Sequence, residues 1–213
     1  AFATSTAMIK RSALTFGITS HNEGESLRTL VTQLLEHTEF PIVILDDNST
    51  DSDTVHILES FRGNDRIQIH TRPLNRDFAA QKNHLTTLCD SEYIFQLDAD
   101  ETLADNLIQY IPTILRLGVE LFMVPRVNTV QGLTQEDIQR WGWQVNEQGW
   151  VMFPDYQTRL YKKSDTILWM GAVHERIVGY KTFSVLPAEP DFAILHHKTI
   201  ERQRKQNEFY QTI

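Results

Sequence analysis

Short runs of β-branched and aromatic residues alternate with segments of helical periodicity through the first half of this chain. Parallel strands joined by helices place those helices on both faces of one sheet. The alternation therefore predicts an α/β fold with a Rossmann-like, mostly parallel central sheet. Strands are expected over residues 14–19, 42–45, 67–71, 93–97 and 121–124, and helices over residues 25–37, 79–88 and 103–117, with a further helix whose core face carries Val55, Leu58 and Phe61.

The alternation ends near residue 128. Strand-like pieces follow at residues 158–162, 167–170 and 182–185, and a charged helix is expected from Thr199. Residues 131–150 have no clear period and contain three of the four tryptophans, Trp141, Trp143 and Trp150. Large aromatic side chains serve both sugar-binding loops and packed cores, so these residues are expected either to line an acceptor site or to pack a small cap. With no repeat or linker, the chain is expected to form one domain.

Composition narrows the class of protein. The formal charge of −8 disfavours a nucleic-acid partner, and no apolar run approaches the roughly 20 residues that a membrane helix needs. Ala1–Lys10 lacks the apolar core of a secretory signal, so a cytoplasmic location is expected. Cys89 is expected to be a small buried hydrophobe. The basic cluster Arg202, Arg204 and Lys205 is expected to be a solvated helix face.

Polar clusters end three of the predicted strands, at residues 19–23, at Asp46-Asp47 and at Asp98-Ala99-Asp100. Ligands of open α/β sheets bind outside the carboxyl ends of the strands, so the clusters are expected along one edge. Acidic groups this close repel one another unless a cation lies among them, and Mg²⁺ or Mn²⁺ prefers oxygen ligands. The sequence therefore predicts a Mn²⁺ or Mg²⁺ site at Asp98 and Asp100. The alternative is that these aspartates cap the following helix.

Four segments, in this order and at this spacing, resemble the family 2 glycosyltransferases, enzymes of the GT-A fold that use nucleotide-diphosphate sugars. The segments are residues 16–23, 44–51, 78–83 and 95–101. The resemblance implies a GT-A fold with a small β and loop region on the acceptor side. It also implies a nucleotide-sugar-binding half at residues 13–127, after a tail at 1–12, and an acceptor-binding and catalytic half at 128–213.

The resemblance implies roles in donor binding. Thr19 and Asp47 should contact the nucleoside, Asp47 favouring uracil, and His21 can stack on the base. Arg76 and Lys82 should approach the donor or the carboxylates of Asp98 and Asp100, although both also suit surface positions. The full expected donor set is Thr19, Ser20, His21, Glu23, Asp47, Arg76, Lys82, Asp98 and Ala99.

The resemblance also implies a catalytic carboxylate that follows a glycine. Glu175, in residues 171–175, is the first candidate for the base and Asp155 the second. The structural alternative for Glu175 is an ion pair with Arg176 or Arg159.

A late histidine is often the third metal ligand in enzymes of the GT-A fold. His196 is the expected third ligand beside Asp98 and Asp100, with His197 in reserve. Lys198 and Arg202 are candidates to close over the diphosphate.

Together these features predict an inverting, metal-dependent transfer from a UDP-sugar such as UDP-glucose to an unknown saccharide, lipid or protein acceptor. A homo-oligomer would help to complete the acceptor side of so short a chain. The alternatives are a non-catalytic nucleotide-sugar binder and a phosphatase of the haloacid dehalogenase type, since residues 98–102 imitate its Asp-x-Asp-x-Thr motif. The three α/β units that precede the motif disfavour the phosphatase.

Overall fold

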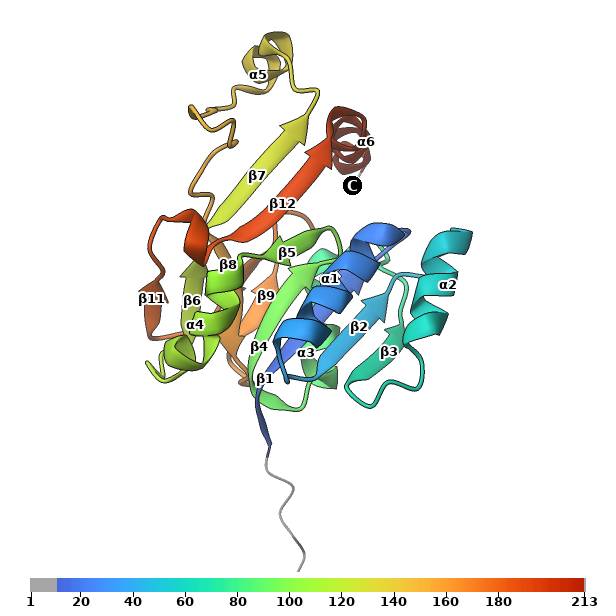
Figure 1. Ribbon diagram of the computed structural model, residues 1–213, viewed down its shortest axis with the longest axis vertical. Coiled ribbons are helices and arrows are strands. Elements are labelled where there is room, and N and C mark those ends of the chain that lie inside the picture. The colour runs from blue at the N-terminus through green and yellow to red at the C-terminus, as the bar shows by residue number, and fades with distance from the viewer. Residues whose placement is uncertain (1–10, 213) are drawn as a thin grey trace, which may run out of the picture.

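A seven-stranded sheet forms the centre of the molecule (Figure 1). The computed structural model describes residues 11–212, so residues 1–10 of the expected tail lie outside it. The strand order is β11-β6-β8-β4-β1-β2-β3. Four strands from the first half run parallel: β1 (Ser12–Ser20), β2 (Ile42–Asp46), β3 (Ile67–Thr71) and β4 (Ser91–Asp98). The predicted mostly parallel sheet is confirmed.

The second half of the chain completes this sheet. β8 (Gln157–Lys162) lies antiparallel between β4 and β6 (Leu121–Val124). β11 (Phe183–Val185) pairs in parallel with the outer side of β6. The expected strand-like pieces at 158–162 and 182–185 are therefore strands of the main sheet.

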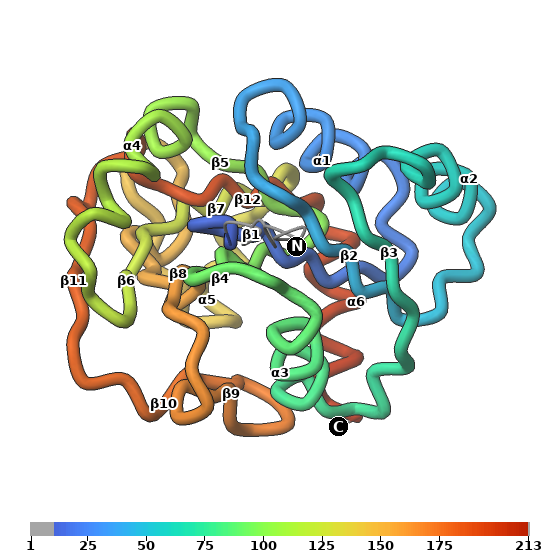
Figure 2. The backbone as a smooth tube through the Cα atoms, turned by 90° about the horizontal axis from the view of Figure 1, so that it is seen from below, coloured from blue at the N-terminus to red at the C-terminus, as the bar shows by residue number. Residues whose placement is uncertain are grey.

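Helices cover both faces of the sheet (Figure 2). On one face lie α1 (Glu25–His37), α2 (Ser52–Phe61) and α4 (Asp105–Leu115), whose apolar side chains join those of β1 and β4 in one core cluster. On the other face lie α3 (Phe78–Leu88) and the hairpin of β9 (Leu168–Met170) and β10 (Arg176–Val178), which form a second cluster. Cys89 is 1% exposed in that second cluster, so its expected burial is confirmed.

A small sheet rises above one end of the central sheet (Figure 1). Its order is β5-β12-β7, from β5 (Glu101–Leu103), β12 (Ile194–Thr199) and β7 (Arg126–Gln131). β12 runs antiparallel to β5 and parallel to β7, and it leads directly into α6 (Ile200–Tyr210). A short 3-10 helix, η1 (Pro190–Phe192), precedes β12. The pairing of these three strands places Glu101, Arg126, Asn128 and His196 close together, although they are far apart in the sequence.

Two local expectations are wrong. The helix expected from residue 103 begins at Asp105, because Glu101–Leu103 pairs with β12 instead. Val55 is 45% exposed, although it was expected on the core face of α2. The Asp51 carboxylate accepts a hydrogen bond from Thr54 N at 2.9 Å and sets the start of this helix, so that Thr54, Ile57 and Leu58 face inward.

The tryptophan-rich stretch contains one helix that its lack of period concealed. α5 (Gln135–Trp141) starts with a capping box in which Thr134 and Asp137 bond each other's backbone. Gly142 ends it with φ at 65°, the left-handed conformation that glycine adopts most easily. None of the helices within residues 11–212 has the length and apolar character needed to cross a membrane.

Candidate functional site

The carboxyl ends of β1, β2 and β4 lie side by side at one edge of the sheet. Thr19 is the register partner of Asp98, and Ser20 that of Asp46, so the predicted gathering of polar strand ends is confirmed. A cavity of about 920 Å³ opens at this edge. The predicted site residues that line it are Thr19, Ser20, His21, Glu23, Asp47, Lys82, Asp98, Ala99, Asp100, Asp155, Glu175 and His196.

Two predicted residues lie apart from this cavity. Arg76 is exposed, and its guanidinium donates to the Thr212 carbonyl at 3.4 Å. His197 is exposed on the face of β12 opposite to His196, because side chains alternate along a strand. The structure therefore brings His196, and not the reserve His197, to the site.

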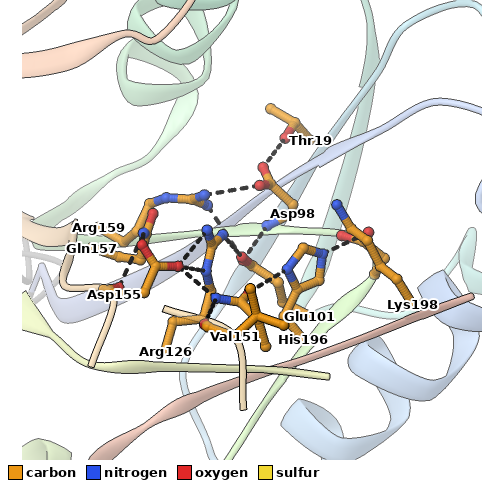
Figure 3. Close-up of polar contacts among 12 residues, drawn as sticks. Thr19, Asp98, Glu101, Arg126, Val151, Asp155, Gln157, Arg159, His196 and Lys198 are labelled. Carbon is orange, nitrogen blue, oxygen red and sulfur yellow. Dashed lines mark hydrogen bonds and ion pairs between the residues drawn. The ribbon is translucent and has the colours of Figure 1, made fainter. Parts of the chain in front are cut away.

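Asp98, which is partly exposed, belongs to a network of charges whose other members, Arg159 and Glu101, are buried (Figure 3). Its Oδ1 accepts from Thr19 Oγ1 at 3.1 Å and its Oδ2 from Arg159 Nη2 at 2.9 Å. Arg159 Nη1 lies 3.3 Å from Oε2 of Glu101, a fully buried residue that also accepts from Arg126 at 3.0 Å. Burial opposes ionisation, but the charges of Arg159 and Lys82 hold the pKa of Asp98 below its ordinary value.

Asp100 forms a second cluster with residues from the end of the chain. Its Oδ2 lies 3.0 Å from His196 Nε2 and 3.1 Å from Arg202 Nη2, and Arg202 also pairs with Glu23. Burial opposes the shift, but the hydrogen bond and charge of His196 lower the pKa of Asp100. Burial and the nearby Asp100 raise the pKa of Glu23.

Of the two expectations for Arg202, the solvated face of α6 is wrong, and the structure places the side chain at the cavity instead. Its guanidinium points into the cavity because Glu23 and Asp100 lie there. Arg204 instead pairs with Asp137 of α5 at 3.1 Å, while Lys205 lines the cavity. Lys198, also at the cavity, donates to Gln206.

The donor atoms at Asp100 and His196 suit a divalent cation. A carboxylate oxygen and an imidazole nitrogen converge there, and both are common ligands of such ions. Asp98, the third expected ligand, directs its oxygens to Thr19 and Arg159. Within residues 11–212, no group of three or more acidic, histidine or cysteine side chains is arranged to hold a metal. The residues therefore fit an ion held by two side chains together with phosphate oxygens, as Mg²⁺ often is.

Glu175 lies in a tight loop between β9 and β10. Gly171 opens the loop with φ at 100°, a conformation that side chains disfavour, and Ala172 O accepts from Phe78 N of α3 at 3.0 Å. The Glu175 carboxylate accepts from Lys82 Nζ, rather than from the expected Arg176 or Arg159. Besides the main cavity, Glu175 lines a smaller cavity of about 290 Å³.

Lys82 is buried beneath that carboxylate. Its Nζ lies 4.5 Å from the ring centroid of Trp169. Burial and then the neighbouring Arg159 lower the pKa of Lys82, while Asp98 and Glu175 oppose the shift. Lys82 thus pairs directly with the loop carboxylate of Glu175, and its charge also acts on Asp98 at the strand end.

Asp155 is engaged by three side chains. Its Oδ2 accepts from Arg126 Nε at 2.8 Å and from Asn128 Nδ2 at 2.7 Å. Its Oδ1 accepts from Gln157 Nε2 at 3.1 Å. Its surroundings therefore resemble those of an anchoring group more than those of a base open to substrate.

The nucleoside end of the predicted site is formed by the loops after β1 and β2. Asp47 Oδ1 accepts from Leu74 N at 2.8 Å, which ties the loop after β3 to the sheet edge. His21 Nδ1 lies 2.6 Å from the Asp47 carbonyl oxygen. Both side chains border the cavity, as the predicted contact with a base requires.

Sequence reasoning missed Arg126 and Asn128. They stand two residues apart on β7, so both point toward the site. The alternation of side chains after the strand at 121–124 could have indicated them, but β7 itself was not predicted.

The three tryptophans of residues 131–150 lie in different places. Trp143 lines the cavity, and the ring of Trp141 packs against the ring of Trp143, with 4.7 Å between their centroids. The ring of Trp150 packs instead against Phe153, at 5.0 Å between centroids.

Both the sequence and the fold of this chain are similar to those of known glycosyltransferases. Residues 15–186 match glycosyl transferase family 2, and no curated protein matches the sequence. Among solved structures, residues 1–349 of S. aureus TarS superpose with a TM-score of 0.61 at 15% identity, over 87% of this chain and 60% of that one. The complex of the same fragment with UDP-GlcNAc gives a TM-score of 0.63 at 16% identity, over 87% and 58%.

The longer TarS structure gives a TM-score of 0.59 at 14% identity, over 87% of this chain and 36% of that one. This chain therefore spans about 60% of the length of the shorter TarS structure. At such identities the likeness concerns the fold. It confirms the predicted GT-A arrangement of a mostly parallel sheet flanked by helices.

Proposed function

The chain belongs to glycosyl transferase family 2, and from that premise we propose that it transfers a sugar from a UDP-sugar to a hydroxyl acceptor in a metal-dependent, inverting reaction. The observation that carries the proposal is that one cavity is lined by Asp98, Asp100, His196 and Glu175. TarS, which has a similar fold, has been crystallised with UDP and with UDP-GlcNAc, and this supports a UDP-sugar donor.

Asp100 and His196 would hold Mn²⁺ or Mg²⁺, which when bound offsets the charge of the diphosphate as the nucleotide leaves. Arg202 and Lys198 add positive charge on the same side of the cavity. Asp98, whose carboxylate is fixed by Thr19 and Arg159, lines the same cavity. Thr19, His21 and Asp47 would then receive the nucleoside.

Glu175 is the proposed catalytic base. It would accept the proton of the acceptor hydroxyl as that oxygen attacks the anomeric carbon. Lys82 anchors one of its oxygens and compensates its charge, while the carboxylate still borders open space. Asp155 suits this role less, because Arg126, Asn128 and Gln157 occupy its oxygens. A single displacement assisted by one base inverts the anomeric centre.

The test is donor hydrolysis, which needs no acceptor. Release of UDP is measured from UDP-glucose, UDP-GlcNAc and other nucleotide sugars with Mn²⁺. Glu175→Gln should lower the rate by about 10²–10⁴-fold, the usual contribution of a general base, and leave donor binding intact. Glu92→Gln is the matched control, because Glu92 also pairs with a lysine, Lys162, at 3.2 Å but is 54% exposed.

The outcomes separate the alternatives. Unchanged hydrolysis in Glu175→Gln would show that another group is the base. A wild-type protein that binds a nucleotide sugar without turnover in any acceptor screen would be a non-catalytic binder. The phosphatase alternative is wrong, because residues 98–102 lie inside the segment that matches the glycosyl transferase family.

A further inference from the structure

The imidazole of His196 is bound, on the side opposite to Asp100, by a chain of hydrogen bonds that runs through Asn128 to Asp155. His196 on β12 is the register partner of Asn128 on β7, and its Nδ1 lies 2.9 Å from Asn128 Oδ1. Its other nitrogen, Nε2, lies 3.0 Å from Asp100 Oδ2. His196 is 7% exposed, so these contacts determine how its ring is oriented.

The Asn128 amide has only one orientation that suits its neighbours. Its Nδ2 lies 2.7 Å from a carboxylate oxygen of Asp155 and 3.4 Å from the Val151 carbonyl oxygen, and both of these atoms are acceptors. The amide NH₂ must therefore face them, which turns Oδ1 toward His196. Asp155 is fixed in turn by Arg126 and Gln157 (Figure 3).

An amide oxygen only accepts, so the His196 Nδ1 that faces it must carry a hydrogen. Nε2 faces the Asp100 carboxylate, which also only accepts, so both ring nitrogens donate in this arrangement. A metal ion at Asp100 would take the place of the hydrogen on Nε2, while Asn128 keeps the hydrogen on Nδ1. We propose that Asn128 is a positioning residue that fixes the tautomer and orientation of His196 for metal binding, and that Asp155 acts through Asn128. This inference rests on the metal site of the proposed function.

The next pair along the same two strands provides a contrast. Thr129 Oγ1 hydrogen-bonds to His197 Nδ1, and these residues are also register partners. A hydroxyl can donate or accept, so this bond leaves the His197 tautomer open. The two pairs therefore differ in what orients the histidine. The ring of His197 is exposed and bonds to a hydroxyl, whereas His196 faces an amide that the Asp155 carboxylate holds in one orientation.

The direct test is ¹⁵N NMR of the histidine rings in wild-type protein with Mg²⁺ and UDP. Long-range couplings should place the hydrogen of His196 on Nδ1. A hydrogen on Nε2 would overturn the proposal. This measurement needs no variant, so a failure of any mutant to fold does not affect it.

The second test is the affinity for Mn²⁺ in the presence of UDP, measured by electron paramagnetic resonance. Asn128→Ala should raise the Mn²⁺ dissociation constant by about 10–100-fold, the usual effect of losing an outer partner of a metal ligand. Thr129→Val is the matched control and should leave it unchanged. Thermal unfolding of both variants establishes that they are folded.

The Mn²⁺ titrations distinguish the role of Asn128 from the metal site itself. If Asn128→Ala binds Mn²⁺ as tightly as wild type, the positioning role is wrong while the metal site stands. If wild-type protein with UDP binds neither Mn²⁺ nor Mg²⁺, the metal site of the proposed function is wrong, and the role of Asn128 with it.

Discussion

Replacing Arg159 by Met should destabilise the protein, because it would leave two acidic side chains without their shared partner. Arg159 is 6% exposed, and its two terminal nitrogens reach different carboxylates, those of Asp98 and Glu101. Methionine keeps much of the length and the apolar part of the side chain. The substitution therefore removes mainly the charge and its hydrogen bonds.

Breaking a buried ion pair by removing one partner typically costs about 3–5 kcal/mol, because the remaining charge stays uncompensated. Glu101 is fully buried and retains Arg126, whereas the Asp98 side chain is 37% exposed and so partly screened by water. Both features place the loss near the lower end, at about 3 kcal/mol. For a protein of this size that lowers Tm by roughly 6–12 °C.

The assay is urea unfolding followed by tryptophan fluorescence, with the slope m compared between proteins. The control is Arg62→Met. Arg62 lies 2.7 Å from Glu59, closer than Arg159 lies to either partner, but the side chains are 58% and 70% exposed. Exposed pairs contribute little, so this variant should match wild type. Arg159→Lys should lie between the two, because one ammonium cannot replace a forked guanidinium.

The loss of unfolding free energy in Arg159→Met should also depend on pH. The charges of Arg159 and Lys82 outweigh burial and keep the pKa of folded Asp98 below its ordinary value, so their stabilisation is present above the unfolded pKa of about 3.9 and is lost in acid. The difference in the free energy of unfolding between wild type and Arg159→Met should be largest near neutral pH and should shrink below about pH 4. A loss of stability no greater than that of Arg62→Met, or one independent of pH, would show that Arg159 does not stabilise the two carboxylates in this way.

Three further outcomes are expected. His196→Ala should weaken Mn²⁺ binding in the presence of UDP by at least about tenfold, whereas His197→Ala should not; equal effects in a Mn²⁺ titration would contradict the assignment. Burial raises the pKa of Cys89 to about 12, so its thiol should react with a disulfide reagent at pH 8 only after unfolding, and rapid reaction of the folded protein would disprove this. Ile111→Ala in α4, at a fully buried position, should cost about 2–5 kcal/mol in urea unfolding, and a cost below that of exposed substitutions would contradict the packing.

Local patterns in the sequence were sufficient to predict most helices and strands in the first half of the molecule. Strand and helix periods alternate cleanly up to residue 124, and polar residues at strand ends such as Asp98 can be placed without knowing distant contacts. The edge that they share follows from parallel pairing alone. The resemblance to a known family then supplied His196 and Glu175, which the structure places at the same cavity.

Apart from Val55, whose exposure follows from the local cap at Asp51, the main errors arose where partners are far apart in sequence. Arg202 was expected to face solvent because its acidic partner, Glu23, lies at the other end of the chain. The ion pair of Glu175 with Lys82 joins separate elements and could not be deduced from either segment. β5 and β7 were missed because their pairing partner, β12, follows long after them, and short strands of this kind have weak local signals.

The position of β8 has a consequence for how the protein folds as it is synthesised. β8 fills the place between β4 and β6, and it carries Arg159 to the end of β4. Until residues 157–162 emerge, β4 has an open edge, and Asp98 and Glu101 lack the arginine that joins them. Contacts between such distant segments form slowly, and exposed strand edges favour aggregation in the meantime. We therefore expect the first half of the chain to be a poor independent folding unit: a fragment ending at residue 127 should be insoluble, whereas one extended beyond β8 should recover solubility.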